Sequence, residues 1–168
     1  FYNDGNGIDI AEHPEYKIWI PEMIFAHLRT GTNYDKSEKK IVGGKNGYGA
    51  KLTNIFSQYF KLETLDSSRG LKYSQIFEDN MKDRGKPKVS KNSGKSYTKI
   101  SWIADFVRFG LDGYSKEMYQ LMERRLYDIS GVTDKQVNVY YNGKMIKQKS
   151  FDKYIGLYLG NEKMIYED

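Results

Sequence analysis

The sequence predicts an α+β fold: a two-layer α/β sandwich in which helices pack against a mixed β-sheet. Segments with helical spacing of apolar residues are interspersed along the chain with segments that alternate apolar and polar residues. Several of the alternating segments come in pairs joined by turn residues, which is typical of hairpins. The 168 residues include 15% aromatics, enough for a proper core, and show no linker or repeat. We therefore expect a single domain over residues 1–168.

The first elements are a strand end and two helices. Phe1-Tyr2-Asn3 is typical of a strand that runs into a turn, and no Met precedes it. We therefore expect a fragment that lacks the N-terminal part of the fold. Pro21 suits the first position of a helix that continues past Leu28 and stops at Gly31. A second helix is expected on the apolar spacing i, i+3, i+4, i+7. Its apolar positions are Leu52, Ile55, Phe56 and Tyr59.

A group of strands should follow. Residues 60–65 and 71–78 form an expected strand pair, turned by Ser68-Arg69-Gly70. Ile100 and Trp102 alternate with a polar residue and predict a third strand.

The last third of the chain predicts a helix, a hairpin and another helix. Ser115 is a suitable N-cap for a helix that runs to Ser130 and stops at Gly131. Its inward positions should be Met118, Met122, Leu126 and Ile129. The run QVNVYY-NG-KMI predicts a hairpin on a type I′ turn. Residues 151–159 carry aromatic and aliphatic side chains at helical spacing and predict a final amphipathic helix.

The charge of the chain is uneven. The net charge is +5, and residues 82–99 contain seven Lys or Arg against one Asp. Gly and Pro in this stretch favour a solvated loop, while the charge would also attract a polyanion such as DNA. The absence of cysteine excludes disulfides and thiolate metal sites. No apolar run is long enough to span a membrane.

The stretch GGKNGYGAK places four glycines and two lysines in nine residues. A P-loop requires Lys directly after the second Gly of its motif, but Ala50 stands there. The dinucleotide-binding pattern is also absent, because the glycine order is reversed. What remains is Gly44-x-x-Gly47-x-Gly49 leading into a helix. Its amides, with Lys45 and Lys51, would suit an anion, although a structural glycine turn explains the pattern equally well.

A second glycine turn lies near the start of the chain. Asp4-Gly5-Asn6-Gly7 follows the expected strand end. A carboxylate held by such a turn can accept a hydrogen bond from an exocyclic amine, and the glycines allow a flat ring to approach the backbone. An ordinary surface turn is the alternative.

Together the two turns resemble the ATP-binding (Bergerat) fold of gyrase B, type II topoisomerases, histidine kinases and MutL. More narrowly, the sequence resembles the ATPase domain of eukaryotic-type DNA topoisomerase II, including the versions carried by large DNA viruses. The resemblance covers nearly the whole chain. The matching segments are YNDGNGI, YKIWIPEMIFAHL, TGTNYD, EKKIVGGKNGYGAKLTNIFS, RRLYDISG, NVYYNGKMI and FDKYIGLYL.

The resemblance implies an ATP site. Asp4 would accept a hydrogen bond from the adenine amino group, and Gly7 would make room for the base. Thr32 and Asn33 match positions that contact ribose and phosphate. Lys45 stands where arginine is usual, which keeps the charge without the bidentate fork. The phosphate-cradling loop would consist of Gly44, Lys45, Asn46, Gly47, Tyr48, Gly49, Ala50 and Lys51.

The resemblance also implies what this chain does not hold. In the family, the glutamate that activates water and the asparagine that ligates magnesium precede the turn at Asp4. The lysine of the next domain, the transducer, would follow Asp168. We therefore expect no catalytic and no metal-ligating residue in this chain, and an inactive fragment.

The implied function is the ATP-driven gate of a type II topoisomerase. ATP with Mg²⁺ would bind, a loop would close over the phosphates, and two protomers would form a homodimer. DNA would be a partner through the full-length enzyme, in the nucleus or at a viral replication site, with no membrane involved. Two alternatives remain: another ATPase of the same fold, of the MutL or histidine-kinase type, and a basic DNA-binding module that uses no nucleotide.

Overall fold

The computed structural model describes residues 1–28 and 47–160. The chain divides into two compact units, Phe1–Gly110 and Leu111–Asp168, and each is described by itself. The expectation of a single domain over 1–168 stays a prediction.

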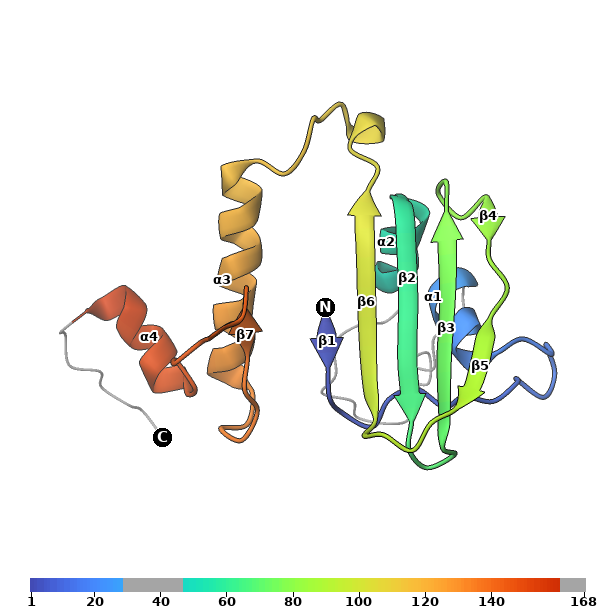
Figure 1. Cartoon of the computed structure of the whole chain (residues 1–168). Helices are drawn as coiled ribbons and strands as arrows, with labels where there is room; N and C mark the ends of the chain where they lie inside the picture. The colour runs from blue at the N-terminus through green and yellow to red at the C-terminus, as the bar shows by residue number, and fades with distance from the viewer. Residues whose placement is uncertain (29–46, 161–168) are drawn as a thin grey trace, which may run out of the picture. The chain divides into compact units, whose positions relative to one another are not determined.

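The first unit is built on one sheet with the strand order β1-β6-β2-β3-β4, and β5 also pairs with β3 (Figure 1). All pairings between the described strands are antiparallel. The α+β class is confirmed, but the described sheet is antiparallel where a mixed sheet was expected. The reason is local: a four-residue turn joins β2 to β3, and such short turns join antiparallel neighbours. The strands are β1 (Tyr2–Asn3), β2 (Ser57–Asp66), β3 (Leu71–Glu78), β4 (Asp83–Arg84), β5 (Lys88–Lys91) and β6 (Tyr97–Ala104).

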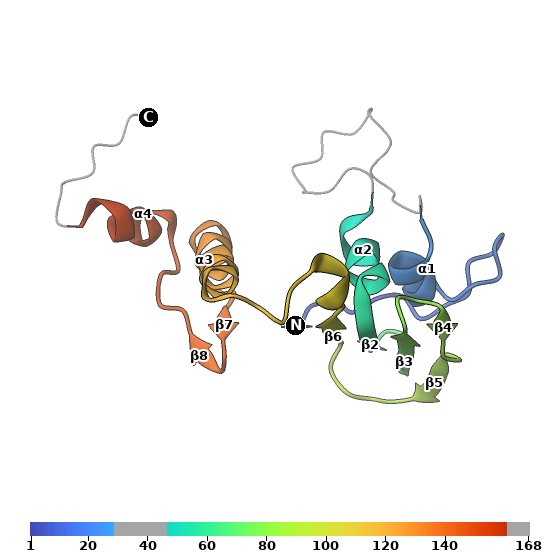
Figure 2. The same ribbon diagram turned by 90° about the horizontal axis from the view of Figure 1, so that it is seen from above.

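Two helices, α1 (Ile20–Ala26) and α2 (Gly49–Ile55), lie on the same face of this sheet (Figure 2). Alternate residues of β2 and β3 point toward them, because successive side chains of a strand face opposite sides. The unit therefore has one apolar face, and its other face mixes charged residues with apolar ones such as Tyr59, Ile76 and Ile103. The buried core consists of Ile10, Phe25, Ala26, Phe60, Leu62, Tyr73, Phe77 and Met81.

The first helix begins as expected and ends earlier. Pro21 lies in its first turn, but the helix ends at Ala26, and His27 already has extended backbone angles. Leu28, expected to lie within the helix, follows its end and is 57% exposed. The apolar spacing that predicted Leu28 therefore outlasted the helix itself.

The second helix corrects the expected apolar stripe. It ends at Ile55, so Tyr59 belongs to β2, and Leu52 is 45% exposed. The buried positions of α2 are Lys51 and Asn54. The helical spacing arose because the end of a helix and the start of a strand follow each other within four residues. An apolar spacing that runs across the end of a helix into a strand therefore predicts the buried face of neither element.

The strand pair and the third strand are confirmed as β2, β3 and β6. Leu62 pairs with Gln75 on one side and with Ile100 on the other. The basic stretch 82–99, expected as a loop between strands, contains β4, β5 and the start of β6. A short 3₁₀ helix, η1 (Val107–Phe109), ends the unit.

The second unit begins with α3 (Lys116–Val132), whose N-cap Ser115 accepts a hydrogen bond from the Met118 amide at 3.3 Å. The helix continues through Gly131, which was expected to stop it. A β-carbon at Gly131 would lie 2.8 Å from the β-carbon of Tyr154, so this glycine allows close packing. Among the expected inward positions, Ile129 is 41% exposed and Met122 is 37% exposed.

The predicted hairpin and final helix are confirmed. Asn142 (φ 48°) and Gly143 (φ 76°) both have positive φ, as a type I′ turn requires. They connect β7 (Tyr140–Tyr141) to β8 (Lys144–Met145), and α4 (Phe151–Leu159) follows. The Tyr154 hydroxyl donates to Asp128 at 2.6 Å and joins α4 to α3.

Candidate functional site

The start of α2 is open to an anion. Gly47 has a φ of 65°, a left-handed conformation that favours glycine. The N-cap Tyr48 makes no side-chain hydrogen bond to the helix, and the first intrahelical bond is that of the Leu52 amide to the Tyr48 carbonyl. The preceding amides, including those of Gly49 and Lys51, therefore receive no cap from Tyr48. Such amides, at the positive end of the helix, attract phosphate.

Lys51 lies in the first turn of α2 and is buried, with 3% of its surface exposed. No carboxylate of residues 1–28 or 47–160 forms a salt bridge with it. Burial lowers the pKa of Lys51, because the charged form loses its hydration. The described residues supply no carboxylate to this buried ammonium, and an anionic ligand would stabilise its charged form.

Asn54 holds α2 in place. Its side chain is fully buried, and its Nδ2 donates to the Phe25 carbonyl at the end of α1 at 3.1 Å. The buried Oδ1 has no hydrogen-bond partner within the part of the chain that the structure describes. At the far end of the helix, Asn80 Nδ2 donates to the Ile55 carbonyl at 3.0 Å. These bonds fix the direction in which the first turn of α2 points.

The turn Asp4–Gly7 lies against the end of β2. Asp4 is exposed, and the Gly5 amide donates to Asn3 Oδ1 at 2.9 Å. Gly7 has a φ of 76°, and a β-carbon there would lie 2.2 Å from the Leu65 carbonyl oxygen. No other residue fits at this position, because the backbones of the turn and of β2 are in direct contact.

Two threonines that sequence reasoning missed accompany this turn. Thr64 accepts a hydrogen bond from the Ile8 amide at 3.0 Å and donates to the Tyr97 carbonyl at 2.8 Å. Its hydroxyl is also 3.2 Å from that of Thr98, which pairs with Asn3 across β1. The available signal was a polar residue at a core-facing position, since Thr64 continues the buried series of Phe60 and Leu62.

Asp66 was missed as well, and it clamps the same segment. Its two oxygens accept hydrogen bonds from the Ile10 amide at 3.3 Å, from the Ser68 hydroxyl at 2.6 Å and from Arg69 Nη1 at 2.8 Å. Burial opposes ionisation of Asp66, but the hydrogen bonds from Ser68, Arg69 and Ile10 outweigh it and hold the pKa well below its ordinary value. Arg69 also forms a salt bridge with Asp9 at 3.1 Å.

The turn and the helix start lie on the same face of the sheet. Ile8 and Ile10 pack into the core beneath α1 and α2. The last turn of α2 lies next to the start of β2, because α2 leads directly into that strand. The helix is about 10 Å long and runs back over the strand, so its first turn is displaced by about that length in the direction of Thr64. Figure 1 shows α2 behind β2, with the N-terminal segment crossing the end of β2. The predicted positions Thr32, Asn33, Gly44, Lys45 and Asn46 lie outside the described residues.

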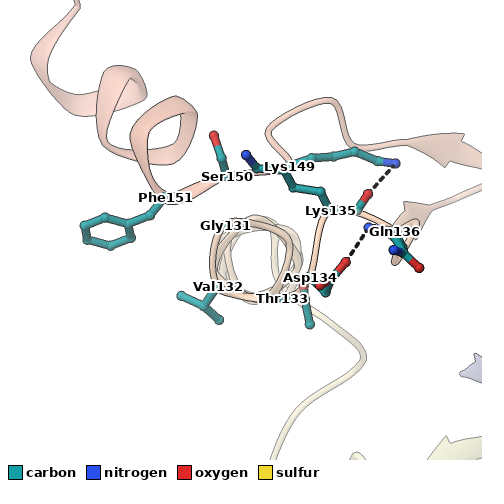
Figure 3. Close-up of a pocket in the computed structure, with 9 residues that line it drawn as sticks. All are labelled: Gly131, Val132, Thr133, Asp134, Lys135, Gln136, Lys149, Ser150 and Phe151. Atoms are coloured by element: carbon teal, nitrogen blue, oxygen red, sulfur yellow. Dashed lines mark hydrogen bonds between the residues drawn. The ribbon is translucent and has the colours of Figure 1, made fainter.

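A separate pocket occurs in the second unit, where α3 ends and α4 begins (Figure 3). It contains none of the predicted site residues. Lys149 Nζ donates to the Lys135 carbonyl at 3.3 Å and to Asn138, and the Gln136 amide donates to Asp134 at 2.8 Å. Its polar groups therefore bond to one another. Its lining is Gly131, Val132, Thr133, Asp134, Lys135, Gln136, Lys149, Ser150 and Phe151.

Residues 1–28 and 47–160 contain no group of three or more His, Cys, Asp or Glu side chains placed to hold a metal ion. In the same residues, no helix has the length and apolar character needed to cross a membrane.

The chain is similar to known proteins along nearly its whole length. It is 46% identical over 170 residues to the DNA topoisomerase 2 of Acanthamoeba polyphaga mimivirus and 50% identical over 158 residues to that of Saccharomyces cerevisiae. These matches cover 99% and 94% of this chain but only 13% and 11% of the relatives, so the chain spans about an eighth of their length. No family model matches the chain.

Solved structures show the same similarity. The ATPase region of Saccharomyces cerevisiae topoisomerase II superposes with a TM-score of 0.89 at 49% identity, covering 94% of this chain and 42% of that one. The ATPase and transducer domains of DNA topoisomerase II from Balamuthia mandrillaris give a TM-score of 0.86 at 39% identity, covering 93% of this chain and 41% of that one.

Proposed function

Because the chain belongs to the DNA topoisomerase 2 family and corresponds to part of its ATPase region, we propose that it is an ATP-binding part of a type II DNA topoisomerase. The observation that carries the proposal is the buried Lys51 in the first turn of α2, where the N-cap residue leaves the amides uncapped. A triphosphate supplies the negative charge that this ammonium lacks among the described residues.

The two glycine turns have separate roles in this site. Asp4 accepts a hydrogen bond from the adenine amino group, and Gly7 keeps the backbone thin where the base approaches. The amides of Gly47 to Ala50 and the ammonium of Lys51 bind the phosphates. Thr32, Asn33, Gly44, Lys45 and Asn46 complete the ribose and phosphate contacts, as the family resemblance implies.

The catalytic groups lie outside this chain in the proposal. The family's general base and its asparagine ligand of Mg²⁺ match no residue of this chain, and in the proposal these residues alone do not hydrolyse ATP. The described residues offer no metal cluster, and they do not fit Mg²⁺ without the nucleotide. What this chain contributes is therefore binding and orientation of ATP.

In the whole enzyme, ATP binding closes a gate. Contacts that form only in the closed state shift the population toward a homodimer of this region, which couples nucleotide use to DNA strand passage. DNA is a partner of the full-length enzyme, which acts in the nucleus or at a viral replication site. The comparisons support this function over the two alternatives, an ATPase of the MutL or histidine-kinase type and a DNA-binding module without nucleotide use.

Calorimetry with a non-hydrolysable ATP analogue and Mg²⁺ tests the site. The protein to use is the whole ATPase region that contains this chain. Lys51→Ala removes the buried ammonium, and Gly47→Val forces a β-branched residue into positive φ. Each should abolish measurable binding, whereas the exposed control Lys116→Ala should bind like the wild type. Undiminished binding by Lys51→Ala and Gly47→Val would refute the site.

A further inference from the structure

The face of the sheet opposite α1 and α2, here called the open face, carries lysines from four strands. They are Lys61 of β2, Lys72 of β3, Lys88 of β5 and Lys99 of β6. Only Lys88 and Lys99 belong to the basic stretch noted in the sequence. The fold therefore brings together lysines that are far apart in the sequence. We call these four residues the open-face lysines.

Strand register places these lysines around one point. Lys99 pairs with Glu63, Glu63 pairs with Ser74, and Ser74 pairs with Lys88, so these four residues form one row across the sheet. Lys61 and Lys72 lie two residues from this row, on opposite sides of it. Strands are about 4.8 Å apart, so the row extends about 14 Å. A DNA duplex presents about eight phosphates over that length.

The centre of this surface is positively charged. Glu63 forms salt bridges with Lys61 at 3.1 Å and with Lys72 at 3.7 Å. Lys88 and Lys99 are exposed and form no salt bridge with any described residue. A hydrogen bond with Tyr97, assisted by the charge of Glu63, raises the pKa of Lys72. The four lysines exceed Glu63 by three charges at neutral pH, and Glu78 and Asp83 at the end of the same face reduce the net charge to about +1.

The side chains between the lysines are suited to phosphate oxygens. Hydroxyl groups of Ser74, Ser90 and Ser101 lie on the same face, as the register requires. Tyr97 also lies there, and Tyr2 stacks on it with ring centroids 5.5 Å apart. Serine, tyrosine and lysine are typical donors to the DNA backbone. Apolar side chains, among them Tyr59, Ile76 and Ile103, also lie on this face, so the choice of DNA over a protein partner rests on the four lysines.

Protection of the sheet edge does not explain the pattern. Lysines on edge strands commonly prevent strands of different molecules from pairing, and Lys88 of β5 suits that role. Lys61 and Lys72, however, stand on β2 and β3, which have strands on both sides. A lysine on an interior strand has no edge to protect. Edge protection therefore does not account for Lys61 and Lys72.

We propose that the open-face lysines bind the phosphate backbone of duplex DNA without reading its sequence. The choice of DNA as the polyanion rests on the proposed function, but the surface lies on the opposite side of the sheet from the nucleotide site. Glu78 and Asp83, which pair with each other farther along the same face, bound the surface at one end.

Fluorescence anisotropy with a labelled duplex, measured over a series of salt concentrations, tests this proposal on the whole ATPase region. A variant with Lys→Gln at all four open-face lysines should bind at least about tenfold more weakly, and its salt slope should fall by about 3 to 4. A matched control replaces four exposed lysines of the second unit by Gln and reaches the same net charge. Its affinity should stay within about twofold of the wild type. The control positions are Lys116, Lys135, Lys144 and Lys147.

A second variant controls for loss of folding. Replacing both Lys61 and Lys72 by Gln removes the two salt bridges of the partly buried Glu63 and could destabilise the fold. Lys88→Glu with Lys99→Glu changes only exposed side chains and should weaken DNA binding by a similar factor. Equal losses in the open-face variant and the control, or no loss in the charge-reversed variant, would overturn the proposal. Binding of the ATP analogue should persist in every variant. A wild type that binds DNA but not the analogue would instead refute the nucleotide site alone.

Discussion

Asp66 at the end of β2 and Lys51 at the start of α2 are both almost completely buried, each with 3% of its surface exposed. Their surroundings differ. Asp66 accepts hydrogen bonds from the backbone of Ile10 and from the side chains of Ser68 and Arg69. Lys51 forms no salt bridge with any residue that the structure describes.

In our proposal, the difference separates a charge that supports the fold from one that binds the ligand. A buried charge whose hydrogen bonds are complete holds its neighbours in place. Its pKa shifts in the direction that favours the charged form of the group. A buried charge without an oppositely charged partner is destabilising by itself. Its pKa shifts in the direction that favours the neutral form of the group. The second kind is retained where a ligand completes it. Both residues lie on the helix-covered face of the sheet, Lys51 in the first turn of α2 and Asp66 at the end of β2.

Asp66→Asn should have the largest effect on stability. The substitution keeps the shape but removes the charge that accepts hydrogen bonds from Arg69 and the Ser68 hydroxyl. Because the Arg69 side chain is 39% exposed and screened by water, the loss should be about 2 to 3 kcal/mol, as for hydrogen bonds to a charged group. Urea denaturation of the wild type and the variant measures the difference. The exposed control Asp83→Asn should change the free energy of unfolding by less than about 0.5 kcal/mol. Equal effects of the two substitutions would show that the Asp66 network is not structural.

Gly7→Ala should come next. The alanine β-carbon would meet the Leu65 carbonyl oxygen at 2.2 Å, and the φ of 76° adds strain. We expect a loss of about 2 kcal/mol or more in the free energy of unfolding. Gly113→Ala is a matched control in the same protein, since nothing lies within 4 Å of the added carbon there. A Gly7→Ala protein as stable as the control would mean that the turn does not contact β2.

Lys51→Met should act in the opposite direction on the unliganded protein. It replaces a buried ammonium by an apolar side chain of similar length, so the free energy of unfolding should rise by about 1 kcal/mol. Thermal and urea denaturation without nucleotide measure this gain. A loss of stability would indicate that Lys51 is already paired in the free protein, contrary to the comparison with Asp66.

The pH dependence of stability should show the smallest effect, and both residues should make stability rise with pH, Asp66 in the acidic range and Lys51 in the basic range. The folded-state pKa of Asp66 is lowered, so its stabilising contribution is present above pH 4 and is lost as the pH falls through the folded-state value. The folded-state pKa of Lys51 is also lowered, so unfolding takes up a proton and stability rises as the pH increases toward 10. Asp66→Asn should flatten the acidic limb of the curve and Lys51→Met the basic limb.

Most strands and turns could be predicted from the sequence because their signals are local. The turn after β2, the type I′ hairpin at Asn142-Gly143 and the cap at Ser115 each depend on a few neighbouring residues. The stripe from Leu52 to Tyr59 failed for the same reason. A local apolar spacing carries no information on where the chain reverses direction, and here it reverses near Phe56.

The candidate site was predictable only in part. The motifs around Asp4 and Lys51 carried the family resemblance and hence their proposed roles. The hydroxyl pair of Thr64 and Thr98 could not be predicted, because it depends on the register between β2 and β6 and joins residues 34 positions apart. The open-face lysines depend on the registers of four strands together. No single segment of the sequence carries such information.

The central claim is that the buried ammonium of Lys51 is completed by the phosphates of a bound nucleotide. Calorimetry on the whole ATPase region can compare a non-hydrolysable ATP analogue with AMP, for the wild type and for Lys51→Met. The account predicts that the variant loses at least about 30-fold in affinity for the triphosphate while its affinity for AMP changes little. Equal losses for the two nucleotides, or no loss for either, would contradict it.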